Sequence, residues 1–295
     1  MCNSGAEANE CAIKLARKYS LDTYGAGRHV IVTLNDSFHG RTVTTLAATG
    51  QDDFHQYFYP FTGGFVHVPA GDMDALAAAV EGAAKDEKVC AVLFEVVQGE
   101  GGVNALDFGY LQAVQAYCRA KDILLIADEI QTGASRTGTF LACEQAGLAP
   151  DAVTMAKGIG GGLPIGACLC NEKLAGVLTA GTHGSTFGGN PVCCAAGRYT
   201  VARLTSPALL NEVWRKGEIL KTRLLACPNV AGVSGLGMML GVELKRGQAR
   251  DMAEKCLTKG LLVLTAKSRV RLLPPLTISD GELEQGLRIL EEVLR

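Results

Sequence analysis

The chain has 295 residues, of which 48% are hydrophobic and 20% are charged, and its formal net charge at pH 7 is -2. This length and composition allow a large buried core and exclude a disordered protein, so we expect a globular chain with more than one domain. The small net charge gives no electrostatic reason to expect nucleic acid or an anionic membrane as a partner.

The eleven cysteines are scattered through apolar segments, with no CxxC pair and no cysteine-histidine set at zinc-ligand spacing. They are interpreted as reduced core residues, and no metal site is expected. The N-terminus lacks the basic and apolar regions of a signal peptide, and no apolar run is long enough to span a bilayer. The sequence therefore predicts a cytoplasmic protein.

Over the first two thirds of the chain, apolar runs alternate with helix-period segments. The predicted strands are residues 30–34, 89–97, 123–127, 152–155 and 165–169, and the predicted helices are residues 8–19, 73–84, 110–120 and 140–146. This alternation indicates an α/β fold with a mostly parallel sheet and helices on both faces. In such sheets, ligands bind outside the carboxyl ends of the strands.

From residue 191 to about residue 225 the pattern is helical, with a break near Ser206 and Pro207. Short predicted strands follow at residues 230–244, 261–264 and 270–273, before a helix that begins near Asp280. We therefore predict a large domain over residues 1–205 and a small C-terminal α/β domain over residues 206–295.

Three segments of the large domain carry candidate chemistry, and the first is the turn Ser4-Gly-Ala-Glu-Ala-Asn-Glu10, which opens a predicted helix. Its unpaired N–H groups and the positive end of the helix dipole suit a phosphate. An ordinary capped helix explains the same residues, and on its own is the simpler interpretation.

The second segment is the apolar strand that ends in Asp128, Glu129 and Gln131. Successive residues of a strand face opposite sides, so the two acids cannot share a role. A buried carboxylate there needs a cationic partner or several hydrogen-bond donors. Too few oxygen ligands lie nearby in sequence for a hard metal ion, whereas a protonated ring nitrogen of a cofactor satisfies the requirement.

The third segment is Lys157, which lies between an apolar strand and the cluster Gly158-Ile-Gly-Gly-Gly162. Burial lowers the pKa of a lysine, which is useful for an amine that acts as a nucleophile. A lysine that reaches outward from a strand end is an equally good interpretation of this stretch alone.

A phosphate site, a deep carboxylate and an isolated lysine are the requirements of pyridoxal 5′-phosphate, or PLP. Seven motifs in family order make the chain resemble the class III aminotransferases: Asn3-Ser-Gly-Ala-Glu-Ala-Asn-Glu10, Phe38-His-Gly-Arg-Thr42, Gln98-Gly-Glu-Gly-Gly102, Ala127-Asp-Glu-Ile-Gln-Thr-Gly133, Ala156-Lys-Gly158, His183-Gly-Ser-Thr-Phe-Gly-Gly-Asn-Pro191 and Arg271-Leu-Leu-Pro-Pro-Leu276. The resemblance covers nearly the whole chain and implies the PLP-dependent transferase fold type I.

The resemblance also implies a role for each cofactor-binding residue. Lys157 resembles the lysine that forms a Schiff base with PLP and shuttles the substrate proton, and Asp128 resembles the carboxylate that keeps the pyridine nitrogen protonated. The resemblance further implies that Gln131 hydrogen-bonds the ring's phenolic oxygen and that Phe38 stacks on the ring. The N–H groups of Gly5 and Ala6 are implied to hold the phosphate. Thr186 is implied to contact the phosphate of the neighbouring subunit in a homodimer.

On the substrate side, the resemblance implies that Arg271 binds the α-carboxylate and that Arg41 binds a second carboxylate. Glu100 is implied to pair with Arg271 when the substrate presents its side-chain amine. The alternatives are a surface position for Arg41, a turn position for Glu100, and an ion pair of Arg271 with Glu243.

The implied activity is transfer of the δ-amino group of N-acetylornithine to 2-oxoglutarate, a step of arginine biosynthesis. Succinylornithine, ornithine δ- and 4-aminobutyrate aminotransferases share most of the motifs and stay open as alternatives. Family members carry a substantial segment before the Asn-Ser-Gly-Ala motif, so an inactive remnant is a further alternative. A nucleotide-binding protein is a weaker one, because Gly158–Gly162 matches neither a G-x-G-x-x-G nor a Walker motif.

Overall fold

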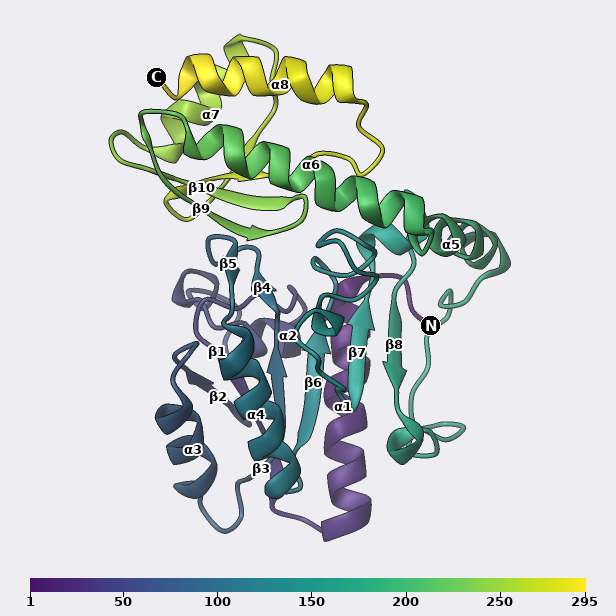
Figure 1. Ribbon diagram of the computed structural model, residues 1–295. Coiled ribbons are helices and arrows are strands. Elements are labelled where there is room, and N and C mark those ends of the chain that lie inside the picture. Colours follow the sequence, from purple (N-terminus) through teal and green to yellow (C-terminus); the bar gives the residue numbers. More distant parts are fainter.

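The computed structural model describes residues 1–295, and its larger part is built on a six-stranded sheet with the order β2-β1-β3-β6-β7-β8 (Figure 1). The strands are β1 (Arg28–Leu34), β2 (Phe65–Val68), β3 (Lys88–Phe94), β6 (Leu124–Asp128), β7 (Ala152–Met155) and β8 (Ala167–Cys170). Neighbouring strands are parallel except β8, which is antiparallel to β7. The predicted mostly parallel sheet is confirmed.

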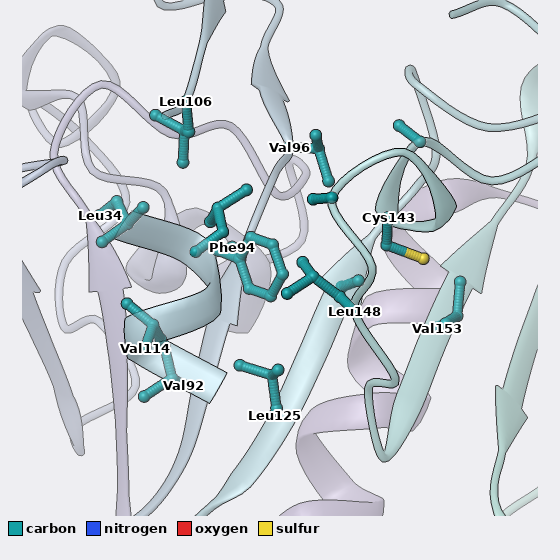
Figure 2. Packing of buried hydrophobic residues seen from close by; sticks show 14 of the residues in the cluster. Leu34, Val92, Phe94, Val96, Leu106, Val114, Leu125, Cys143, Leu148 and Val153 are labelled. Carbon is teal, nitrogen blue, oxygen red and sulfur yellow. The ribbon is translucent and has the colours of Figure 1, made fainter. Parts of the chain in front are cut away.

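Helices cover both faces of this sheet because its strands are apolar on both sides. Helix α1 (Gly5–Tyr24) packs through Ile13 against one face, in a cluster that includes Ile126. Helices α3 (Met73–Glu81) and α4 (Phe108–Ala120) cover the other face. Figure 2 shows that second cluster, where Val114 of α4 lies near Val92 and Leu125 of the sheet. Alternate strand residues thus serve opposite cores.

A second, antiparallel sheet has the strand order β11-β12-β10-β9 and forms the smaller part of the molecule. Its strands are β9 (Val230–Leu236), β10 (Met239–Leu244), β11 (Leu264–Ala266) and β12 (Arg269–Leu272). The helices of this part are α6 (Pro207–Leu225), α7 (Ala249–Thr258) and α8 (Asp280–Val293), which share a separate core with the sheet. The predicted boundary at residues 205 and 206 lies between α5 (Pro191–Leu204) and α6.

Short elements complete the larger part. They comprise α2 (Val43–Ala48), the two-stranded ribbon of β4 (Val97–Gln98) and β5 (Asn104–Ala105), and four 3-10 turns at Asp52–Phe54, Ala142–Glu144, Lys157–Gly160 and Glu172–Leu174. The β4-β5 ribbon rises from the larger part toward β9 of the smaller part (Figure 1). None of the helices has the length and apolarity needed to cross a membrane.

Two predicted elements are wrong. The segment predicted as a helix over residues 140–146 forms only the 3-10 turn Ala142–Glu144. It is too short to nucleate a helix, and the Cys143 N–H donates to the Glu129 carboxylate (2.7 Å) instead of a helical carbonyl. The strand predicted at residues 261–264 begins only at Leu264, because its register is set by antiparallel pairing of Leu264 with Arg271.

Candidate active site

A cavity of about 530 Å³ lies where the carboxyl ends of β6 and β7 meet the N-terminus of α1. This is the edge at which ligands of parallel sheets are expected. Its lining includes seven of the residues that the sequence singles out: Gly5, Ala6, Phe38, Arg41, Asp128, Gln131 and Lys157. Segments more than 150 residues apart in the chain therefore converge on one site.

The N-terminus of α1 supplies the anion-binding part of the cavity. Ser4 caps the helix by accepting the Glu7 N–H (3.2 Å), and the Glu7 carboxylate accepts the Ser4 N–H (3.1 Å). The N–H groups of Gly5 and Ala6 belong to the first turn, which has no intrahelical acceptor. Because they line the cavity, these groups and the helix dipole favour a bound phosphate.

Asp128 ends β6 with its carboxylate buried and held by three donors. Asn9 Nδ2 lies 2.7 Å and His39 Nδ1 lies 2.8 Å from Oδ2, and the Ile130 N–H donates to Oδ1 (3.0 Å). A carboxylate only accepts hydrogen bonds, so His39 carries its proton on Nδ1. These donors stabilise the charged carboxylate, which can then pair with a cationic ring nitrogen.

Asn9 and His39 have roles that the sequence did not predict. Both lie inside the motifs quoted above, but Asn9 is 119 positions and His39 is 89 positions away from Asp128 in the sequence. Asn9 is further fixed by Thr154 of β7, whose hydroxyl donates to Asn9 Oδ1 (2.7 Å). No local pattern reveals these partners.

Glu95 is a further buried carboxyl group, and the sequence did not predict its place in the site. It follows β3, and because Phe94 pairs with Ala127, Glu95 lies beside Asp128 at the edge of the sheet. One donor, the Phe38 N–H, lies within reach at 3.3 Å. Burial, and then the neighbouring Asp128 charge, raise the pKa of Glu95 well above its ordinary value.

We expect Glu95→Gln to stabilise the protein at pH 7. The folded-state pKa of Glu95 is raised, so this residue favours folding only while it is protonated, and that contribution is lost as the pH rises above about 4.5. The gain of the variant in free energy of unfolding should therefore be near zero at pH 4 and grow toward pH 7. Urea denaturation at both pH values measures it, with the exposed Glu87→Gln as control. An equal effect at both pH values would show that the fold does not raise the pKa of Glu95.

Lys157 follows β7 and opens the 3-10 turn Lys157–Gly160. Its backbone has a φ of 48°, a left-handed conformation that is rare for a residue with a side chain and is common at functional sites. The side chain is exposed and lines the cavity, so it forms part of the wall of the site. The surrounding protein lowers the pKa of Lys157 by desolvation, while the charges of Asp128 and Glu95 oppose this shift. A lowered pKa favours the nucleophilic neutral amine.

Glu100 and Arg271 form an ion pair between the two parts of the molecule. Arg271 of β12 donates through Nη1 to Glu100 Oε1 (2.7 Å), and Gln131 Nε2 lies 3.4 Å from the same oxygen. The pair thus contacts the cavity through Gln131. The alternative pairing of Arg271 with Glu243 is wrong, because Glu243 pairs with Arg269 (3.2 Å).

Arg41 and Thr186 are both exposed, and only Arg41 lines the cavity. Arg41 is exposed at the cavity wall, with its guanidinium carbon 5.9 Å from the centre of the Phe38 ring. Thr186 does not line this cavity. It lines a separate depression of about 350 Å³, with Asn3 common to both.

The chain matches a known protein family, curated relatives and solved structures. The family model for "Aminotransferase class-III" matches residues 1–294. The acetylornithine aminotransferase of Haemophilus ducreyi is 55% identical over 293 residues, which are 99% of this chain and 73% of that protein. The solved N-acetylornithine aminotransferase of Stenotrophomonas maltophilia superimposes with a TM-score of 0.82 at 35% identity, over 99% of this chain and 73% of that one. An ornithine aminotransferase of Toxoplasma gondii, solved with partial PLP occupancy at its active site, gives a TM-score of 0.92 at 34% identity, with coverage of 99% and 70%.

Proposed function

The chain belongs to the class III aminotransferases, and from this we propose that it transfers the δ-amino group of N-acetylornithine to 2-oxoglutarate. Its cofactor is pyridoxal 5′-phosphate. When bound, this group withdraws electrons from the amine-bearing carbon of the substrate and makes its proton acidic. The residues of the cavity fit the group, because an anion site, a buried carboxylate and a cavity-facing lysine stand around one space of about 530 Å³.

Each side chain of the cavity has a distinct task in this proposal. The N–H groups of Gly5 and Ala6 hold the phosphate, Phe38 covers the ring, and Gln131 is placed to donate to the ring oxygen. The Asp128 carboxylate, fixed by its three donors, pairs with the ring nitrogen and keeps it protonated. Lys157 would hold the cofactor through its amine, and the same amine would serve as the base that moves the proton at the reacting carbon.

The observation that carries the substrate assignment is the Glu100–Arg271 ion pair. Glutamate has a carboxylate beside its reacting amine, which a guanidinium binds through two parallel hydrogen bonds. The δ-amine of N-acetylornithine has no carboxylate on the adjacent carbon, so an unpaired Arg271 would lack a counter-charge. Glu100 supplies that counter-charge, and one pocket can therefore admit both substrates. Arg41, at the wall of the cavity, is placed for the distal carboxylate.

We infer that two copies of the chain assemble as a homodimer in the cytoplasm. Thr186 stands outside the cavity of its own chain and is exposed, which supports a role at the phosphate of a partner subunit. Sedimentation of the PLP-bound protein tests the dimer, and Thr186→Val tests the contact. The variant should bind PLP more weakly than the wild type, while the absorption spectrum of the PLP that remains bound through Lys157 should be unchanged.

Product analysis tests the proposed donor. The protein, PLP and 2-oxoglutarate are incubated in turn with N-acetylornithine, N-succinylornithine, ornithine and 4-aminobutyrate, and glutamate is quantified. We expect N-acetylornithine to give the highest kcat/KM. A higher value for ornithine would favour the second candidate, to which the T. gondii structure points. Activity without PLP would contradict the proposal.

A further inference from the structure

Two arginines on the same face of β12 bind the loop that carries Glu100. Arg269 and Arg271 are two residues apart on a strand, so their side chains project to the same side. Arg271 pairs with Glu100, whereas Arg269 Nη1 donates to the carbonyl of Gly102 (2.9 Å) and to the side-chain oxygen of Asn104. The loop of residues 99–104, which we call the Glu100 loop, is thus bound to the small domain at two points.

Arg269 is itself held within the small domain. Its Nη1 lies 3.2 Å from Ser234 Oγ of β9, and its Nη2 lies 3.2 Å from Glu243 Oε2 of β10. Side chains of β9 and β10 therefore hold the guanidinium, while the Glu100 loop accepts further hydrogen bonds from it. A planar group with five donors is suited to such a junction, and a lysine is not.

Apolar packing holds the same loop against the small domain. Val103 is fully buried in a cluster with Met239 of β10 and Ala266 of β11. A Cβ on Gly241 of β10 would lie 3.0 Å from the Gly102 carbonyl oxygen, so the strand passes very close to the loop. The Glu100 loop therefore packs closely against the small domain, although it connects β4 and β5 of the large one.

We propose that Arg269 is a positioning residue that keeps the Glu100 loop in register with β12, so that Glu100 neutralises Arg271 whenever no substrate carboxylate is there. This rests on the proposed function and deepens it. With the backbone fixed, exchange of Glu100 for a substrate carboxylate requires only a side-chain movement. In this way Arg269 influences which amino donor is preferred. The two kinds of donor are N-acetylornithine, which has no carboxylate beside its reacting amine, and glutamate, which has one.

Loss of Arg269 should change the two donor reactions in opposite directions. In Arg269→Gln, Glu100 loses its fixed register with Arg271, so Arg271 binds carboxylates more readily and is less often neutralised. The quantity compared is the apparent second-order rate constant of the half-reaction with each donor. Its ratio, N-acetylornithine to glutamate, should fall by about tenfold, the scale of one charge-assisted hydrogen bond. Each rate is measured from the absorbance change of bound PLP in a single turnover. Arg269→Lys should recover only part of the ratio.

Arg250→Gln is the matched control, because Arg250 is an exposed arginine of the small domain that pairs only with Glu254 in its own helix. It should leave the ratio unchanged. An equal loss with both donors in Arg269→Gln, or an unchanged ratio, would overturn the positioning role.

Hydrogen exchange of residues 99–104 separates this inference from the proposed function. The Glu100 loop should exchange faster in Arg269→Gln than in the wild type and in Arg250→Gln. If the wild type reacts with glutamate but not with N-acetylornithine, the proposed donor fails. The exchange result still decides whether Arg269 anchors the loop, and unchanged exchange would contradict it.

Discussion

Lys157→Met is expected to slow transamination by about 10⁴-fold or more, because the variant has no amine to bind PLP or to move the substrate proton. Methionine keeps an unbranched stem of similar length, so the wall of the cavity stays filled. The measurement is glutamate formation from N-acetylornithine and 2-oxoglutarate under saturating PLP. A variant that turns over at the wild-type rate would contradict the assignment of Lys157.

A stability measurement separates lost chemistry from lost folding. Because desolvation lowers the pKa of Lys157 in the fold, its ammonium form opposes folding at pH 7, and this cost disappears only as the pH rises toward the ordinary value of 10.5. Without PLP, the methionine variant should therefore unfold at a urea concentration no lower than that of the wild type at pH 7. A much less stable variant would leave unfolding as the cause of its inactivity, and Lys157→Gln would then be compared.

Asp128→Asn should have the second largest effect, a loss of about 100-fold in the rate of the half-reaction with glutamate. Removal of one partner from a buried charge pair costs about 3 kcal/mol, which corresponds to about two powers of ten in rate. The ring nitrogen would lose its counter-charge, while Asn9 and His39 would face an amide in place of a carboxylate. The rate is followed by the absorbance of bound PLP.

Glu129→Gln is the matched control for Asp128→Asn. Glu129 is the adjacent buried acid, but it does not line the cavity, and its carboxylate accepts from the Thr132 hydroxyl and the Cys143 N–H. Its replacement should leave the half-reaction rate within about twofold, because Glu129 does not line the cavity. An equal rate loss in both variants would show that the Asp128 effect is structural.

The sheet could be predicted from the sequence, and so could the positions of Asp128 and Lys157 at its edge. Continuous apolar runs marked β6 and β7, and Asp128 and Lys157 stand at or just beyond their carboxyl ends, where a parallel sheet gathers its ligands. The small-residue turn at the start of α1 could also be predicted, because a helix N-terminus is a local feature. The roles of these residues required the resemblance to the family.

Other features could not be predicted, because they depend on contacts distant in sequence. The hydrogen bonds of Asn9 and His39 to Asp128, and the position of Glu95 beside it, depend on strand order, which no local pattern encodes. Strand β2 was missed because four residues give a weak alternating signal. The false helix at residues 140–146 shows the converse: its apolar spacing suits a helix, but Glu129 binds its backbone.

We propose that one cavity of this chain binds PLP through Lys157 and uses it to accept an amino group. The most direct measurement is the visible absorption spectrum of the chain after PLP is added and the excess removed, recorded before and after addition of glutamate. We predict a protein-bound PLP band that is lost on addition of glutamate as the cofactor takes up the amino group, and that is absent in Lys157→Met. A folded chain with no such band, or a band that glutamate does not change, would contradict the claim.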